Sequence, residues 1–173
     1  MDLASYIRTV PDFPKPGIQF KDITTLLQNP QAFKYIIDQW KERYTPHDPH
    51  SIVGADARGF IFGSALAYAM EKPFVLVRKK GKLPHDTIAE EYELEYGTDV
   101  LEIHIDSIQK DDRIIMVDDL LATGGTMEAA GKMVETLGGN IVEMAFVVEL
   151  PLLKGRERLE KYDIHSLVEF MVD

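Results

Sequence analysis

The sequence contains no cysteine, and this absence excludes both a disulfide-stabilised fold and a metal site built from thiolates. It also has no run of roughly 18 or more apolar residues, the length that a membrane-spanning helix requires. The first residues, MDLASYIRTV, lack the basic start and the long apolar stretch of a secretory signal. Together these absences predict a cytoplasmic protein with no membrane partner.

The sequence is also poor in positive charge, with 19 Lys and Arg residues against 29 Asp and Glu residues and a formal net charge of -10. A protein that binds nucleic acid needs a surplus of cations to meet the phosphate backbone, so we expect no nucleic-acid partner. The exception is a basic run at residues 78–82 (RKKGK), which directly follows an apolar stretch. A solvated turn is one explanation of this run, and a binding site for an anion is the other.

The chain has the length and composition of one globular domain, with 173 residues of which 45% are hydrophobic. Its first thirty residues differ from the rest, because prolines are scattered there among isolated apolar side chains (Pro11, Pro14, Pro16 and Pro30). This pattern predicts a short helix followed by an irregular segment with turns. We therefore expect a single domain over residues 1–173, with a small N-terminal hood at residues 1–30.

From residue 30 onward, apolar stretches typical of strands alternate with stretches typical of helices. The predicted strands are 51–54, 74–78, 92–96, 100–105, 114–117, 141–148 and 165–168, and the predicted helices begin at Pro30 and cover 60–70, 126–137 and 152–161. The strands at 92–96 and 100–105 are expected to form a hairpin that turns at Gly97. The alternation predicts an α/β fold, with a doubly wound, mainly parallel sheet flanked by helices. Ligands of such sheets bind beyond the carboxyl ends of the strands, here the loops after Gly54, Val77 and Val117.

The most informative stretch is residues 114–126, IIMVDDLLATGGT. An apolar strand is followed by Asp118 and Asp119, whose carboxylates are costly to bury without partners and are therefore expected to face a cleft. A turn that opens a helix comes next, and its converging N–H groups and the helix N-terminus favour an anion. The turn consists of Ala122, Thr123, Gly124, Gly125 and Thr126. Alone it fits a helix cap with a surface turn, but beside two carboxylates it predicts a cradle for a phosphorylated ribose.

This stretch resembles the motif with which type I phosphoribosyltransferases bind 5-phosphoribosyl pyrophosphate (PRPP). Further stretches are similar to the members of that family that use adenine: 11–26 (PDFPKPGIQFKDITTL), 54–63 (GADARGFIFG), 77–84 (VRKKGKLP) with 93–97 (ELEYG), and 149–159 (ELPLLKGRERL). The resemblance covers nearly the whole chain. It implies the type I phosphoribosyltransferase fold. The polar segment 80–91, which contains Gly81 and Pro84 and lies between strands, is expected to form a flexible lid loop, with a simple hairpin excursion as the alternative. It also implies transfer of the 5-phosphoribosyl group from PRPP to adenine, giving AMP and pyrophosphate in purine salvage.

The resemblance also assigns the contacts to PRPP. The 5-phosphate would lie on the loop of residues 122–126, and the ribose hydroxyls would meet Asp118 and Asp119. Mg²⁺ is the implied cofactor, held mainly by PRPP and water near these two carboxylates and not by a dedicated protein cage. The pyrophosphate would be bound by Asp56, Ala57, Arg58, Arg78, Lys79 and Lys82. A cis peptide bond is implied near Asp56–Ala57, and Arg58 would act in catalysis, with a surface salt bridge as the alternative.

The adenine-binding residues implied by the resemblance are Gln19, Phe20, Lys21 and Leu150. Phe20 and Leu150 would cover the two faces of the base, while main-chain groups of Gln19 and Lys21 would read its edge. Glu95 would act as a catalytic residue by managing the proton at adenine N7, with an exposed strand glutamate as the alternative. Tyr96, at the far end of the lid, would close over the ribose or the phosphate.

The implied partners are adenine, PRPP, AMP, pyrophosphate and a second copy of the chain. In the resulting homodimer one basic residue of the 78–82 run would reach the neighbouring subunit's site, and the sequence does not decide which one. Two other functions remain open at this point. One is a phosphoribosyltransferase for guanine, hypoxanthine, xanthine or orotate. The other is a regulator that senses PRPP and binds DNA or RNA, although this acidic chain shows neither a basic face nor an added helix-turn-helix domain.

Overall fold

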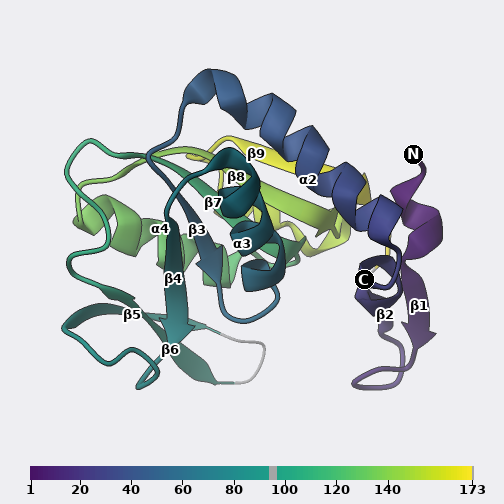
Figure 1. The fold of residues 1–173 in the computed structure, drawn as a ribbon. Helices are drawn as coiled ribbons and strands as arrows, with labels where there is room; N and C mark the ends of the chain where they lie inside the picture. Colours follow the sequence, from purple (N-terminus) through teal and green to yellow (C-terminus); the bar gives the residue numbers. More distant parts are fainter. Residues whose placement is uncertain (94–96, 173) are drawn as a thin grey trace.

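The computed structural model describes residues 1–93 and 97–172 and has the predicted α/β architecture (Figure 1). Its main sheet, within the described residues, has seven strands in the order β5-β6-β4-β3-β7-β8-β9. These strands are β3 (Ser51–Ala55), β4 (Phe74–Lys79), β5 (Thr87–Glu93), β6 (Thr98–His104), β7 (Arg113–Leu121), β8 (Asn140–Glu149) and β9 (Ile164–Glu169). Strands β4, β3, β7, β8 and β9 run parallel to one another. At the edge of the sheet, β6 pairs antiparallel with β4, and β5 pairs antiparallel with β6. Strand β3 is followed by β4 on one side of it, and the adjacent strand β7 is followed by β8 on the other side. Where two adjacent strands lead in opposite directions along a sheet, a crevice opens at their carboxyl ends.

Helices cover both faces of this sheet, with α2 (Pro30–Tyr44) and α3 (Gly59–Met70) on one face and α4 (Gly125–Thr136) on the other (Figure 1). Helix α2 begins as the sequence predicts: Pro30 takes its first position, and the side chain of Asn29 accepts a hydrogen bond from the Ala32 N–H. Trp40 of α2 and Phe62 of α3 are fully buried and pack edge to face, with ring centroids 6.1 Å apart. These contacts make the first of two apolar cores, and the second lies between the sheet and α4.

The hood contains more regular structure than its prolines suggested. It consists of η1 (Leu3–Tyr6), β1 (Arg8–Pro11), β2 (Gln19–Asp22) and α1 (Thr24–Leu27), and it ends at Asn29 because Pro30 belongs to α2. Strands β1 and β2 form an antiparallel pair separate from the main sheet, and Arg8 forms an ion pair with Asp22 across it (Figure 1). The prediction of an irregular segment was therefore wrong for these strands. The prolines do not disrupt the pairing of these strands, because Pro14 and Pro16 lie in the connecting loop and Pro11 lies at a strand end.

Two strand boundaries near the predicted site also differ from prediction. Strand β7 does not end before the aspartates but runs through them to Leu121, because Leu120 and Leu121 pair with Val148 and Glu149 of β8. The predicted antiparallel hairpin is confirmed as β5 and β6, but β5 already starts at Thr87. Only residues 80–86 of the predicted lid loop therefore lack regular structure, since the rest pairs with β6.

The predicted helix at 152–161 is replaced by two short turns, η3 (Pro151–Leu153) and α5 (Gly155–Arg158). Between them Lys154 adopts a left-handed conformation with φ of 60°. That conformation is incompatible with a continuous right-handed helix, so it divides the segment. The amphipathic spacing of 152–161 correctly indicated helical geometry but not the break.

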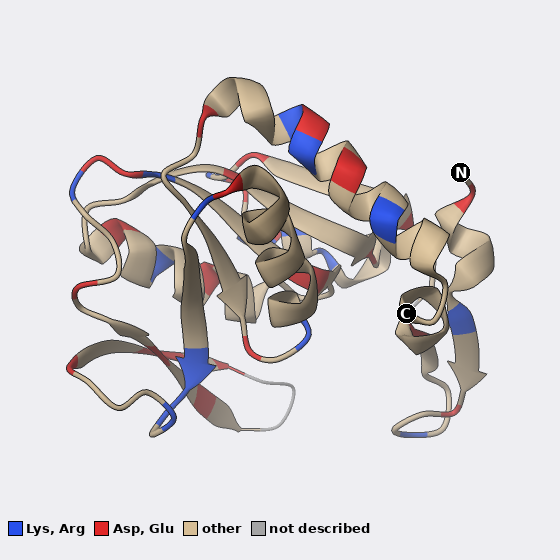
Figure 2. Cartoon of the chain, viewed as in Figure 1, with Lys and Arg blue, Asp and Glu red and all other residues tan. Residues whose placement is uncertain are grey.

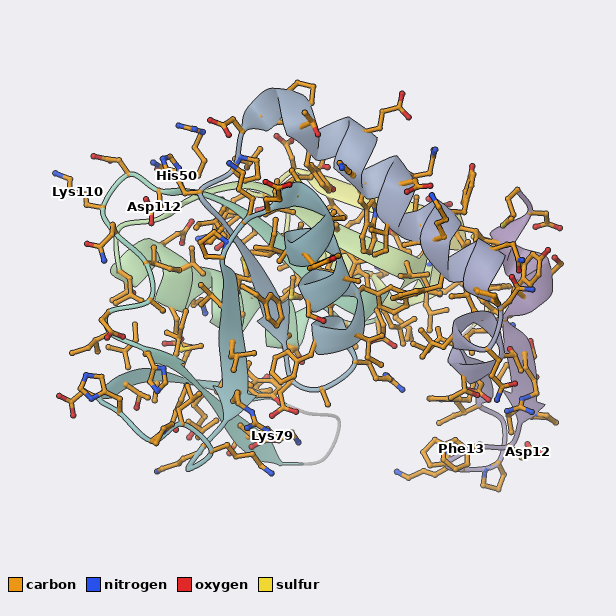
Figure 3. The ribbon with its side chains drawn as sticks, in the orientation of Figure 1. Asp12, Phe13, His50, Lys79, Lys110 and Asp112 are labelled. Atoms are coloured by element: carbon orange, nitrogen blue, oxygen red, sulfur yellow. The ribbon has the colours of Figure 1, made fainter. Side chains whose placement is uncertain are left out.

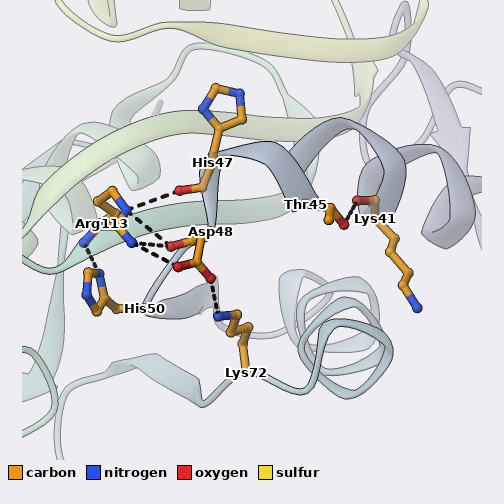
Figure 4. A network of polar contacts seen from close by, with 7 residues as sticks. All are labelled: Lys41, Thr45, His47, Asp48, His50, Lys72 and Arg113. Carbon is orange, nitrogen blue, oxygen red and sulfur yellow. Dashed lines mark hydrogen bonds and ion pairs between the residues drawn. The ribbon is translucent and has the colours of Figure 1, made fainter.

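The end of the sheet opposite the predicted site is closed by a polar network around Arg113 (Figure 4). The Arg113 guanidinium donates to the main-chain oxygens of His47 and Asp48, and Lys72 donates to the Asp48 carboxylate at 2.7 Å. The network ties η2 (Thr45–His47) to the start of β7. His50 belongs to this network, because its Nδ1 atom accepts a hydrogen bond of 2.8 Å from the Arg113 N–H (Figure 4). Figure 3 shows His50 at one end of the molecule, and Lys79 and Phe13 at the other. Among the described helices, none has the length and apolar character needed to cross a bilayer.

Candidate active site

A cavity of about 400 Å³ lies where the hood meets the carboxyl ends of β7 and β8. Its walls come from the hood, from β5, from the loop that opens α4 and from the segment after β8. The lining residues are Ile18, Gln19, Phe20, Lys21, Tyr92, Glu93, Leu120, Ala122, Thr123, Gly125, Thr126, Leu150 and Leu153. All the predicted base-binding residues and all but one of the predicted phosphate-loop residues therefore share one cavity, although up to 130 positions separate them in sequence.

The exception, Gly124, shapes the phosphate loop from behind. It has a φ of 82°, a conformation that favours glycine, and it precedes the first residue of α4. A Cβ at this position would lie 3.0 Å from the main-chain oxygen of Gly155. Both the backbone conformation and the close packing therefore require glycine here. The turn directs the N-terminal N–H groups of α4 toward the cavity, as an anion site requires.

The two aspartates lie beside this cavity within β7. The Asp118 Oδ1 atom accepts a hydrogen bond of 2.8 Å from the Asp119 N–H, and Asp119 is only 4% exposed. Burial, and then the neighbouring Asp119 carboxylate, raises the pKa of Asp118 well above its ordinary value of 3.8. Burial likewise raises the pKa of Asp119, against the opposing effect of Arg58. Two crowded carboxylates of this kind favour a ligand that brings hydroxyl donors or a cation.

Arg58 connects the aspartates to the hood. Its Nε atom lies 2.8 Å from Asp119 Oδ2, and its guanidinium carbon lies 5.8 Å from the centroid of the Phe20 ring. The salt bridge expected as the alternative for Arg58 is therefore present, but it forms inside the predicted site and not on a remote surface. Gly59 allows this approach, because a Cβ there would lie 2.7 Å from the Val117 main-chain oxygen and 3.0 Å from Asp118 Oδ1.

The turn after β3 has the predicted cis peptide bond between Asp56 and Ala57. The Asp56 carboxylate forms an ion pair with Arg78 of β4 at 3.2 Å. These residues and Arg58 thus gather at the carboxyl ends of β3 and β4, where basic residues are also visible in Figure 2. The predicted pyrophosphate residues of these two strands therefore lie in one region beside the aspartates.

The other two residues of the predicted cationic wall lie differently. Lys79 forms an ion pair of 2.9 Å with Asp99 of β6, and this hydrogen bond raises the pKa of Lys79. Lys82 is exposed on the loop between β4 and β5. The predicted role of both lysines in binding pyrophosphate stays a prediction.

The hood presents Phe20 to the cavity with support from both sides of its hairpin. The Phe13 ring packs edge-on against the Phe20 ring at a centroid distance of 5.1 Å. The ammonium group of Lys21 donates to the Thr9 hydroxyl at 2.8 Å and lies 4.3 Å from the centroid of the Phe170 ring. The ammonium group of Lys21 is therefore engaged within the hood, while the residue also lines the cavity, and the contact of its main chain with the base stays a prediction.

Several lining residues were not predicted: Ile18, Tyr92, Glu93, Leu120 and Leu153. Leu120 lies within the predicted motif, so the alternation of side chains along β7 would have identified it. Tyr92 enters through the antiparallel pairing of β5 with β6, a long-range feature that sequence spacing does not reveal. The predicted Glu95 and Tyr96 lie outside the described residues, and their roles stay predictions.

The fit to a metal ion rests on the aspartates. Among residues 1–93 and 97–172, no group of three or more His, Asp or Glu side chains is arranged to hold a metal. Asp118 and Asp119 nevertheless offer hard oxygen atoms with raised pKa values, which a divalent cation would lower. The donor set therefore fits Mg²⁺ that takes most of its ligands from elsewhere.

Comparisons with known proteins agree with this geometry. The family model of the phosphoribosyl transferase domain matches residues 22–172. The adenine phosphoribosyltransferase of Acetivibrio thermocellus is 56% identical over 98% of this chain and 100% of its own length. The crystal structure of adenine phosphoribosyltransferase from Thermoanaerobacter pseudethanolicus matches with a TM-score of 0.93 and 50% identity, covering 98% of each chain. A structure of the Saccharomyces cerevisiae enzyme complexed with an imino-altritol bisphosphate and adenine matches with a TM-score of 0.92 and 40% identity, covering 96% of each chain.

The chain therefore belongs to the phosphoribosyl transferase family, and its fold is the predicted type I fold of that family. Within the family, the relatives it matches from end to end are adenine phosphoribosyltransferases. The enzyme from Trypanosoma brucei, which is 28% identical and has a TM-score of 0.89, was crystallised with AMP, pyrophosphate and ribose-5-phosphate.

Proposed function

We propose that this chain transfers the 5-phosphoribosyl group of PRPP to adenine, forming AMP and releasing pyrophosphate in purine salvage. One observation carries the proposal: a single cavity is lined both by the phosphate loop, through Ala122, Thr123, Gly125 and Thr126, and by the apolar side chains of Phe20 and Leu150. A phosphate cradle and an aromatic base pocket in one cavity fit a nucleotide. The full-length similarity to adenine phosphoribosyltransferases supports adenine as the base.

The phosphate loop and the aspartates hold the ribose phosphate of the substrate. The N–H groups at the start of α4 and the hydroxyls of Thr123 and Thr126 donate to the 5-phosphate. Asp118 and Asp119 accept hydrogen bonds from the ribose hydroxyls. The raised pKa values of both aspartates favour this binding, because hydroxyl donors and a cation relieve the repulsion between the two carboxylates.

Arg58 stabilises the leaving pyrophosphate. Arg58 forms an ion pair with Asp119, and ribose hydroxyls and a cation bound at that carboxylate would leave the guanidinium available to the pyrophosphate. The turn at Asp56 and Ala57 supplies main-chain groups, and Arg78 adds a second guanidinium beside it. Positive groups placed where charge develops lower the barrier to departure of the leaving group.

Mg²⁺ fits this site near Asp118 and Asp119, bound mainly by PRPP oxygens and water. When bound, the ion would supply positive charge to the leaving pyrophosphate. The protein contributes carboxylate oxygens that bind the ion directly or through water. The chain's own residues then have the task of holding ribose C1 in line between the leaving group and the incoming base.

The base lies between Phe20 and Leu150, with main-chain groups of Gln19 and Lys21 at its edge. Attack through N9 requires adenine to lose a proton, and Glu95 is proposed to manage it at N7. Tyr96 and the segment 80–91 are proposed to close over the bound substrates and exclude water. Glu93, the last residue of β5, lines the cavity, and Glu95 follows it by two positions.

A homodimer is supported by an apolar face of the isolated chain. Ile61 and Tyr68 of α3 are 39% and 88% exposed, and Leu76 of the neighbouring strand β4 is 38% exposed. A helix that is apolar on its outer side is typical of one covered by another subunit. The basic run begins two residues after Leu76, so we propose that the exposed Lys82 enters the partner's site.

The base assignment is tested by incubating the purified protein with PRPP, Mg²⁺ and one base at a time, and by separating the nucleotides formed. Adenine is expected to give AMP and pyrophosphate. Guanine, hypoxanthine, xanthine and orotate are the competing bases in parallel reactions. Formation of a nucleotide from one of these but not from adenine would overturn the assignment.

A further inference from the structure

Strand β8 carries two buried glutamates, each bound by an arginine through two hydrogen bonds. Near the start of the strand, Glu143 accepts from Arg43 of α2 at 2.6 Å and 2.6 Å. At its last residue, Glu149 accepts from Arg156 of α5 at 2.7 Å and 2.8 Å. The two carboxylates are similarly buried, with side chains 11% and 4% exposed. The same interaction thus occurs at both ends of one strand, but only the Glu149 end borders the cavity.

Arg156 joins three elements at that end. Besides the Glu149 carboxylate, its guanidinium donates to the Ile164 main-chain oxygen at 3.2 Å and to the Ser166 hydroxyl oxygen at 3.0 Å, both on β9. The Ser166 hydroxyl in turn donates to Glu149. Because a planar guanidinium bound at several points has little freedom to rotate, it holds α5, β8 and β9 in one arrangement.

The residues next to this cluster form the site. Leu150, which follows Glu149, lines the cavity and donates its N–H to the Leu121 main-chain oxygen at 2.9 Å. Gly155, which precedes Arg156, lies against the phosphate loop: a Cβ on it would be 2.4 Å from the Ala122 main-chain oxygen. The segment 150–155, between Glu149 and Arg156, therefore contains the predicted base-covering residue Leu150 and packs against the phosphate loop through Gly155.

We infer that Arg156, through its pair with Glu149, is a positioning residue that fixes Leu150 relative to the phosphate loop and so sets the distance between the base and phosphate subsites. Without the guanidinium, Glu149 would keep the Ser166 hydroxyl but lose both charge-assisted hydrogen bonds. A buried carboxylate that loses these two donors must find new ones in water or in neighbouring groups, and this change displaces the end of β8. The inference rests on the proposed function, because the two subsites are those of adenine and PRPP.

The test compares Arg156→Met with the matched control Arg43→Met. Methionine retains an unbranched apolar side chain and removes the guanidinium in both cases, so both variants should lose thermal stability. Only Arg156→Met should raise the KM for adenine and for PRPP, by on the order of tenfold, since a small displacement of a binding wall has effects of that size. Arg156→Lys keeps the charge but not the two-point geometry, and it should recover part of the loss.

The outcomes separate positioning from mere stabilisation. If Arg156→Met loses stability as Arg43→Met does while both KM values stay at the wild-type level, the inference is overturned. If Arg156→Met does not fold, Arg156→Lys and Ser166→Ala carry the same comparison, and unchanged KM values in both would overturn it equally. A wild-type protein that forms no AMP would overturn the proposed function itself, which is visible before any variant is compared.

Discussion

Asp118 shows at the scale of a single residue how binding and stability oppose each other. Its pKa is raised in the folded chain by burial and by the neighbouring carboxylate. A carboxyl group whose pKa rises on folding stabilises the native state below its ordinary value, 3.8 here, and this contribution is lost as the pH rises through the folded pKa. At a pH above the folded pKa of Asp118, the paired carboxylates therefore lower the free energy of unfolding relative to its value at low pH.

Replacing Asp118 by asparagine should consequently raise the melting temperature of the ligand-free protein at pH 8. The expected rise is about 2–4 °C for each kcal/mol by which the free energy of unfolding increases. The advantage should shrink as the pH falls toward 4, where the wild-type carboxyl takes up its proton. The same variant should lower kcat/KM for PRPP, by on the order of 100-fold, because ribose and metal lose a charged acceptor. Thermal melts across pH with steady-state kinetics measure both effects.

Asp106→Asn is the control for that comparison, since Asp106 is an exposed aspartate in a loop. It should change neither the melting temperature nor the kinetics. A melting temperature of Asp118→Asn that equals the wild-type value at pH 8 would show that the pair is not electrostatically strained.

At the scale of elements, the contact between α5 and the phosphate loop depends on a glycine. A Cβ at Gly155 would lie 2.4 Å from the Ala122 oxygen and 2.6 Å from Leu121 Cδ1, so Gly155→Ala must displace the loop or the short helix. We expect a loss of roughly 1–3 kcal/mol of stability, typical of overpacking, together with a raised KM for PRPP. Chemical denaturation and kinetics at saturating adenine measure the two quantities.

Gly139→Ala provides the matched control for this element. Its Cβ would also be crowded, though less severely and only by side-chain methyl groups, 2.9 Å from Val134 Cγ1 and 3.0 Å from Ile108 Cγ2, and it lies beyond the other end of α4. It should lose stability without any change in KM. An unchanged KM for PRPP in Gly155→Ala as well would show that the phosphate loop tolerates the displaced helix.

At the scale of the whole molecule, the proposed exchange of Lys82 between subunits predicts complementation. Lys82→Ala and Asp118→Asn should each have low activity alone. After the two are unfolded and refolded together, half of the dimers are mixed, and each mixed dimer has one intact site, so about a quarter of wild-type activity should return. If the activity of the mixture equals the sum of the activities of the two variants refolded separately, Lys82 acts within its own chain.

Most of the fold was predictable because it rests on local patterns. The apolar strands β3, β7 and β8 and the helices α2, α3 and α4 were placed within a few residues, since hydrophobic periodicity and a proline at a helix start are local signals. The hood hairpin, the start of β5 and the break at Lys154 were not predicted. Each of these depends on pairing or on a backbone conformation that neighbours in space impose.

The sequence by itself determined the chemistry of the site, because the carboxylates and glycines of residues 114–126 act through adjacent backbone. Only the tertiary structure decided which side chains meet there. It brings Phe20 and Leu150 to one cavity, pairs Lys79 with Asp99, and pairs Arg58 with Asp119. These outcomes follow from strand order and from ion pairs between distant elements, and spacing along the chain does not encode such pairings.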